Sequence, residues 1–337
     1  MENGLRSMDE HGCFETGEID LRCLRPRSAR TVLFSVVSLL LFAFATHASS
    51  TQRHPAQRTA QHLHAKHTSE VRPRPAGKPK LMASCGFGPR AVSALHSRAA
   101  YVFDVDSNTP LLARNARTVR PIASISKLMT AIVARDVARP LNGVLRVTAR
   151  DRDTIKFTGS RLPIGAELSR RDMFHIALMS SENRAASALS HDYPGGRARF
   201  VTAMNQEARR LGMRHTHFRE PTGLSPHNVS TAEELARLVN AAAQDPLIRY
   251  FSTDMSTTVR FGENELQYMN SNPLVRNRSL PIRLQKTGFI KESGHNVVIS
   301  MSVKGRRETI VLLGAPTRAG VMSDATKIHR WLSCSIR

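Results

Sequence analysis

Strand-like segments lie at both ends of residues 85–337, with helical segments between them, and this order restricts the fold more than any other feature. Residues 99–105 and 110–113 predict two strands joined by a turn. Residues 296–303 and 308–314 predict a hairpin around a turn at 304–306. Apolar periodicity predicts helices over 124–138, 172–190, 197–211, 231–242 and 318–333. We therefore expect one α/β domain over 85–337, an antiparallel sheet flanked by helices with an inserted, mainly helical subdomain.

Residues 1–48 are typical of a leader that carries a secretory signal. An apolar run at 32–45 follows four arginines, and small residues after it allow cleavage behind Ala45 or Ala48. The run is shorter than a transmembrane helix requires, and no stretch of 18 apolar residues occurs in the chain. We expect export and no stable membrane span in the mature chain. An uncleaved anchor and a start downstream of Met1 stay open.

Residues 49–84 predict a flexible basic linker, because they lack apolar periodicity and are rich in proline, glutamine and basic residues. The histidines of this segment are too scattered to indicate a metal site: His54, His62, His64 and His67. Of the formal charge of +22, residues 85–337 carry +17. No nucleic-acid recognition motif accompanies this charge, so we expect no nucleic acid as partner and favour an enzyme that meets an anionic polymer.

Two of the four cysteines, Cys13 and Cys23, precede the signal and would be removed with it. Cys85 and Cys334 would then be the only cysteines of the exported chain, at its two structured ends. An oxidising compartment favours a disulfide between them, although two unrelated thiols remain the alternative.

The segment Ser124-Ile125-Ser126-Lys127 places a hydroxyl and an amine on one face of a predicted helix. A serine is a weak nucleophile until a base takes its proton. Lysine is such a base only when burial or a neighbouring cation lowers its pKa toward neutrality. The apolar residues on both sides of the segment provide that setting, and the helix start leaves the Ser124 amide able to stabilise an oxyanion.

Two further motifs follow in order, and each occurs once in the chain. Ser181-Glu182-Asn183 is its only Ser-x-Asn, and Lys286-Thr287-Gly288 is its only Lys-Thr-Gly. Residues 85–337 hold six lysines, of which two fall in these motifs. Singly each motif is weak, but the ordered set is specific.

This set of motifs resembles the penicillin-binding proteins and serine β-lactamases. The flanking segments "IASISKLMTA", "ALMSSENRAASAL", "PTGLS" and "KTGFIKESG" look like low-molecular-mass D-alanyl-D-alanine peptidases of the S11 family. They most resemble its endopeptidase subgroup, the penicillin-binding protein 7 type, over about residues 97–320. The resemblance implies a β-lactamase/transpeptidase-like fold, with residues 85–337 as the serine D,D-peptidase catalytic domain.

Carried over residue by residue, the resemblance implies four catalytic side chains. Ser124 would be the acylated nucleophile and Lys127 its general base. Ser181 would relay a proton to the leaving amine, and Asn183 would position Lys127 and the substrate amide.

The third motif is implied to bind substrate. Lys286 would supply positive charge, and Thr287 would hydrogen-bond the carboxylate end of the peptide. Gly288 would let the peptide lie against an edge strand. The backbone amides of Ser124 and Phe289 would form the oxyanion hole.

The implied reaction is hydrolysis of murein peptide stems through an acyl-enzyme, with no cofactor and no metal, in the periplasm, and with β-lactam antibiotics as covalent inhibitors. We favour an endopeptidase that cuts D-alanyl–diaminopimelate cross-links over a carboxypeptidase that removes the terminal D-alanine. A β-lactamase is a weaker alternative, because Glu220 does not match the deacylating glutamate and is interpreted as loop structure. A murein-binding protein with a dead site, and a metallopeptidase built on His215 and His217, are also weaker.

Overall fold

The computed structural model describes residues 77–79, 81–86 and 88–336. The predicted signal at 32–45 and most of the predicted linker lie outside these residues. In the part of the chain that is described, no helix is both long and apolar enough to cross a membrane.

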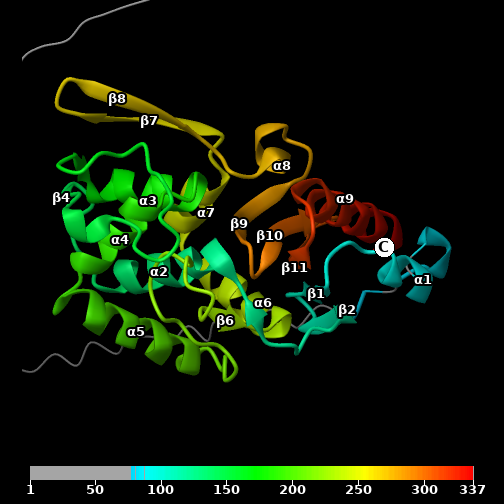
Figure 1. The fold of residues 1–337 in the computed structure, drawn as a ribbon. Helices are drawn as coiled ribbons and strands as arrows, with labels where there is room; N and C mark the ends of the chain where they lie inside the picture. The colour runs from blue at the N-terminus through cyan, green and yellow to red at the C-terminus, as the bar shows by residue number, and fades with distance from the viewer. Residues whose placement is uncertain (1–76, 80, 87, 337) are drawn as a thin grey trace, which may run out of the picture. The chain divides into compact units, whose positions relative to one another are not determined.

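A five-stranded antiparallel sheet forms the centre of the described unit, in the order β2-β1-β11-β10-β9. Strands from both ends of residues 85–337 therefore build one sheet, as the sequence predicts, and the β10–β11 hairpin is confirmed. β9 lies at one edge with its outer side unpaired in the sheet (Figure 1). The strands are β1 (Ala99–Asp104), β2 (Thr109–Arg114), β9 (Ile282–Ile290), β10 (Gly294–Val303) and β11 (Arg306–Ala315).

Each face of the sheet is buried against helices, because successive side chains of a strand point to opposite sides. On β10, Val297, Ile299 and Met301 pack with α9, whereas Val298 belongs to the core on the other face. The core that contains Val298 also includes side chains of α6 and α2. The helices around the sheet are α1 (Pro89–Ser93), α6 (Ala232–Ala242) and α9 (Arg318–Ser335).

The segment between β2 and β9, apart from α6, forms the predicted helical subdomain (Figure 1). Its helices are α2 (Ser126–Asp136), α3 (Arg170–Met179), α4 (Asn183–His191), α5 (Gly196–Arg210), α7 (Pro246–Thr253) and α8 (Pro273–Arg276). Its strand pairs are β3 (Arg120–Pro121) with β6 (Val229–Ser230), β4 (Val144–Arg146) with β5 (Glu167–Ser169), and β7 (Ser256–Phe261) with β8 (Asn264–Met269). Three short 3₁₀ helices complete the list: η1 (Ala83–Cys85), η2 (Ala123–Ile125) and η3 (Ala149–Asp151).

The single helix predicted over 172–190 is wrong, because the chain breaks between α3 and α4 at residues 180–182. Ser181 has a positive φ of 70°, which ends a right-handed helix. The Glu182 side chain then accepts a hydrogen bond from the Arg184 amide and caps α4. Both helices bury apolar side chains in the same core, so their periodicity runs across the break.

Two further expectations can be compared with the structure. Thr231 caps α6 by accepting a hydrogen bond from the Glu234 amide at 3.1 Å, so this helix begins where the helix predicted over 231–242 begins. Cys85 and Cys334 are joined by a disulfide with a Cα–Cα distance of 5.7 Å, and it links η1 to the end of α9.

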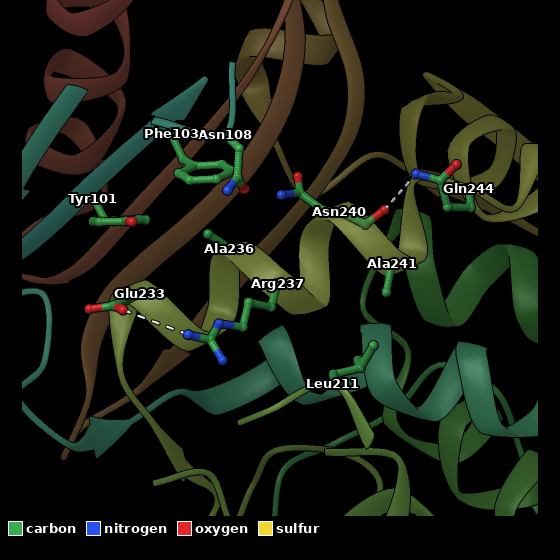
Figure 2. A pocket seen from close by; sticks show the side chains of 10 residues that line it. All are labelled: Tyr101, Phe103, Asn108, Leu211, Glu233, Ala236, Arg237, Asn240, Ala241 and Gln244. Carbon is green, nitrogen blue, oxygen red and sulfur yellow. Dashed lines mark hydrogen bonds and ion pairs between the residues drawn. The ribbon is translucent and has the colours of Figure 1, made fainter. Parts of the chain in front are cut away.

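A cavity of about 550 Å³ lies between β1 and α6 (Figure 2). Tyr101 and Phe103 of β1 line one side, and Glu233 and Arg237 of α6 line the other. None of the residues singled out from the sequence as site residues lines it.

Glu308 on β11 is a buried acid without a counter-charge in contact. Its side chain is inaccessible to solvent, and neither carboxylate oxygen has a hydrogen-bond partner among the described residues. Burial, and then the negative charge of Asp104, raise the pKa of Glu308 to about 8. The folded state therefore holds this side chain protonated at neutral pH.

We predict that Glu308→Gln stabilises the protein at neutral pH and leaves it unchanged near pH 4. Glu308 has a higher pKa in the folded protein than in the unfolded chain. The wild-type protein is therefore most stable below the pKa of the unfolded chain, and it loses stability as the pH rises toward 8. At about 1.4 kcal/mol per pKa unit, the variant gains about 3 kcal/mol over the wild type at pH 7. Urea unfolding of both proteins between pH 4 and 8 measures this, and parallel stability curves would contradict it.

Candidate active site

Ser124 lies in a tight turn where η2 leads into α2, beside the edge strand β9. Ala123, just before it, has a positive φ of 50°. Two glycines from other parts of the chain pack closely against this turn. A Cβ on Gly223 would lie 2.0 Å from the Ala123 carbonyl oxygen, and one on Gly288 would lie 3.0 Å from the Ser124 nitrogen. The position of the serine backbone therefore depends on glycine at both sites.

Lys127 lies one helical turn after Ser124 and is 1% exposed. Its Nζ atom is 3.0 Å from Ser124 Oγ. It also donates to Asn183 Oδ1 at 2.8 Å and to the Thr222 carbonyl oxygen at 2.6 Å. The amine thus joins α2, the start of α4 and the loop 219–228.

Burial lowers the pKa of Lys127 to about 8, against the carboxylates of Glu220, Glu182 and Asp153, which raise it. A pKa near 8 leaves a substantial neutral fraction at working pH. Neutral lysine has two hydrogens and one lone pair. The Asn183 and Thr222 oxygens can only accept hydrogen bonds, so they take both hydrogens and the lone pair is directed at Ser124 Oγ. This arrangement prepares the amine to act as a base.

The third motif lies on β9, with Lys286 fully buried. Lys286 Nζ donates to the Thr287 carbonyl oxygen at 2.9 Å, and Thr287 Oγ1 lies 2.6 Å from Ser271 Oγ. Burial, and then the charge of Lys127, lower the pKa of Lys286 well below its ordinary value. An incoming carboxylate would reverse that shift by favouring the ammonium form.

Asn183 contacts Lys127 directly, whereas Ser181 makes no hydrogen bond to Lys127 or Lys286 within the described residues. Ser181 and Asn183 instead line a cavity of about 700 Å³ whose far side is formed by β8. Phe289 follows Gly288 on β9, and its ring is 57% exposed and stacks on His295. Its side chain is thus turned toward solvent.

Glu220 is loop structure, as the sequence suggested. Its carboxylate accepts hydrogen bonds from the backbone amides of Thr222, Gly223 and Ser225. The Thr222 hydroxyl and the Asn228 amide group also donate to it. With its oxygens engaged by these donors, Glu220 is not arranged as a base for a deacylating water.

Sequence reasoning missed the loop residues that support the serine and the lysine. Asn228 is fully buried and donates to Ser126 Oγ at 2.9 Å, and the Thr222 carbonyl accepts from Lys127. Thr222 lies within the quoted segment "PTGLS" and Asn228 follows three residues after it, and this segment indicated the family but not what the loop contacts.

The two histidines considered for a metallopeptidase have other partners. His215 Nδ1 lies 2.9 Å from Glu234 Oε1, and the backbone of His217 pairs with Val229.

A serine hydroxyl 3.0 Å from a buried lysine amine, beside the edge strand of an antiparallel sheet, is an arrangement typical of serine hydrolases. Comparison with known proteins agrees with this class. Residues 88–317 match the family model of peptidase S11, described as D-alanyl-D-alanine carboxypeptidase. The chain belongs to the S11 peptidase family.

Curated relatives lie within the same family. The chain is 44% identical over 240 residues to a D-alanyl-D-alanine endopeptidase of Pseudomonas aeruginosa, covering 71% of this chain and 77% of the relative. It is 39% identical over 265 residues to one of Escherichia coli, covering 75% and 86%.

The solved structure of the Streptomyces K15 DD-transpeptidase matches with a TM-score of 0.66 at 23% identity, over 72% of this chain and 98% of that chain. This match confirms the predicted β-lactamase/transpeptidase-like fold.

We predict that acylation of Ser124 by benzylpenicillin depends on a group that titrates near pH 8. Only neutral Lys127 accepts the serine proton, so the second-order rate should level off above pH 8 and fall about tenfold per unit well below it. Stopped-flow measurements from pH 6 to 9.5 test this, with Lys291→Ala, an exposed lysine, as the control. A rate that is flat across this range would contradict the assignment.

Proposed function

We propose that this protein is a murein endopeptidase that cleaves D-alanyl–diaminopimelate cross-links through an acyl-enzyme on Ser124. The observation that carries the proposal is the set of contacts around Lys127, whose two hydrogens have acceptors and whose lone pair is left for Ser124. The names of the two relatives support the choice of substrate.

In the proposed reaction, Ser124 Oγ bonds to the D-alanyl carbonyl carbon as its proton passes to Lys127. The negative oxygen that forms is stabilised by the backbone amides of Ser124 and Phe289. The carbon–nitrogen bond to diaminopimelate then breaks, and Ser181 relays a proton from Lys127 to the leaving amine. Asn183 holds Lys127 throughout. Water then hydrolyses the ester and frees the serine.

The substrate would lie along the open edge of β9. Lys286 and Thr287 would bind its carboxylate, since the buried ammonium form of Lys286 needs an anionic partner. Gly288 leaves the backbone of the strand accessible where a side chain would obstruct the peptide. The 700 Å³ cavity lined by Ser181, Asn183 and β8 offers room for a second peptide stem.

We assign the remaining parts of the chain on the same basis. Residues 1–48 would direct export to the periplasm, 49–84 would link, and 85–337 would form the catalytic domain, closed by the Cys85–Cys334 disulfide. The charge of +17 on residues 85–337 suits a polymer rich in peptide carboxylates. β-Lactams would acylate Ser124, and nucleic acid is not a proposed partner.

We predict that the purified protein converts a cross-linked dimeric muropeptide into monomers. Ser124→Ala should remove this activity by at least about a thousandfold, because it deletes the nucleophile. Liquid chromatography with mass spectrometry follows the dimer and a monomeric pentapeptide side by side. Release of D-alanine from the pentapeptide with the dimer left intact would replace this proposal with a carboxypeptidase. A Ser124→Ala variant as active as the wild type would overturn the acyl-enzyme.

A further inference from the structure

A turn at residues 153–158, here called the Asp153 turn, is organised by one carboxylate beside the catalytic residues. Asp153 Oδ1 accepts hydrogen bonds from the amides of Ile155 at 2.8 Å and Lys156 at 3.0 Å. Asp153 Oδ2 accepts from the amide and the hydroxyl of Thr158, at 2.9 and 2.7 Å. Burial raises the pKa of Asp153, but these hydrogen bonds outweigh it and hold the pKa below its ordinary value. The carboxylate is therefore charged at working pH.

The Thr158 hydroxyl has one hydrogen, and it is donated to Asp153. Toward its other neighbour, Asn183, the Thr158 oxygen can therefore only accept. Asn183 Nδ2 lies 3.4 Å from it, a long hydrogen bond. The amide oxygen of Asn183 consequently faces Lys127, at 2.8 Å from Nζ.

This orientation decides what neutral Lys127 can do. If the Asn183 amide were turned over, its NH₂ group would face the amine, and the lone pair of Lys127 would accept from Asn183 rather than from Ser124. The base would then be engaged away from the nucleophile. Nothing else in the described contacts of Asn183 distinguishes the two orientations once Lys127 is neutral.

We propose that Asp153 and Thr158 are positioning residues that fix the amide orientation of Asn183 and thereby direct the Lys127 lone pair at Ser124. They act through Asn183 and do not contact the reacting atoms. The proposal deepens the proposed function, because it rests on Lys127 as the base for Ser124.

A second contact joins the Asp153 turn to the sheet. Lys156 Nζ forms an ion pair with Glu292, in the turn between β9 and β10. The Asp153 turn is thus tied at one end to Asn183 in the helical subdomain and at the other to the sheet. Phe157, between the two anchors, has a positive φ of 55°, which is rare for a bulky residue.

The charges that face Lys127 come from four parts of the chain. Glu220, Glu182 and Asp153 raise its pKa. Lys286 lies near enough that the charge of Lys127 lowers the pKa of Lys286. If the Asn183 amide turned over, its NH₂ group would face the Lys127 ammonium and lower the pKa of Lys127 further. Loss of the Asp153 charge would also lower the pKa of Lys127.

The test compares Thr158→Val with Thr158→Ser, and with Thr154→Val as a matched control. Thr154 lies in the same turn and is exposed, and its side chain makes no hydrogen bond within the described residues. Thr158→Val should lower the rate constant of Ser124 acylation by benzylpenicillin about tenfold, with the affinity of the non-covalent complex unchanged. Thr158→Ser should retain the wild-type rate, since it keeps the hydroxyl. Equal rates in Thr158→Val and Thr154→Val would overturn the proposal.

The pH profile separates positioning from a merely structural role. In Thr158→Val, which removes no charge, the acid limb of the acylation rate should move to lower pH, whereas simple loosening of the turn would leave its midpoint in place. Asp153→Asn should move the limb in the same direction through loss of its charge. An unmoved midpoint in Thr158→Val would overturn the proposal. Ser124→Ala is run in parallel: if it is still acylated, the proposed function fails, whereas loss of its acylation together with a wild-type Thr158→Val overturns this inference alone.

Discussion

The burial of one amine, Lys127, is the constraint on which the active site depends. A buried ammonium without partners is costly, and the protein meets that cost both by lowering the pKa of the amine and by supplying acceptors for its hydrogens. The acceptors come from the amide of Asn183 and the carbonyl of Thr222, which belong to separate segments of the helical subdomain. The contacts of Lys127 therefore form only when α4 and the loop 219–228 have folded around it.

The backbone of Ser124 is held by close packing against two glycines. Gly223 and Gly288 approach the turn at residues 122–124 so closely that neither position has room for a Cβ without a shift of the chain. One glycine belongs to a loop and the other to the edge strand β9. The sheet and the helical subdomain thus meet at Ser124, and this brings together Ser124 and Lys286, which lie 162 residues apart in the sequence.

Apolar patterning was sufficient to predict β1, β10, β11 and α9, because each buries a regular set of side chains. It failed at residues 180–182, where the pattern continues through a break made by backbone conformation. β9 also lacks such a pattern, since it carries Gln285 and Lys286 in its buried positions. That strand was inferred only through the family resemblance.

The candidate site divides in the same way. Ser124, Lys127 and Asn183 were identified because their side chains form rare motifs, and the structure brings these three together. The hydrogen bond from Lys127 to the Thr222 carbonyl could not be predicted from the sequence, because every residue has a carbonyl oxygen. Asp153 and Thr158 are ordinary turn residues in the sequence, and only the structure shows that Asp153 contacts Thr158 and that Thr158 contacts Asn183.

The most direct test of this account is the protonation state of Lys127 itself, measured by NMR titration of protein labelled with ¹³C at the lysine Cε. The Lys127 signal is assigned by its loss in Lys127→Ala. The account predicts a titration midpoint near pH 8, well separated from that of exposed lysines. A midpoint near 10.5 would mean that the amine stays protonated at working pH, and it would contradict the role of Lys127 as the base for Ser124.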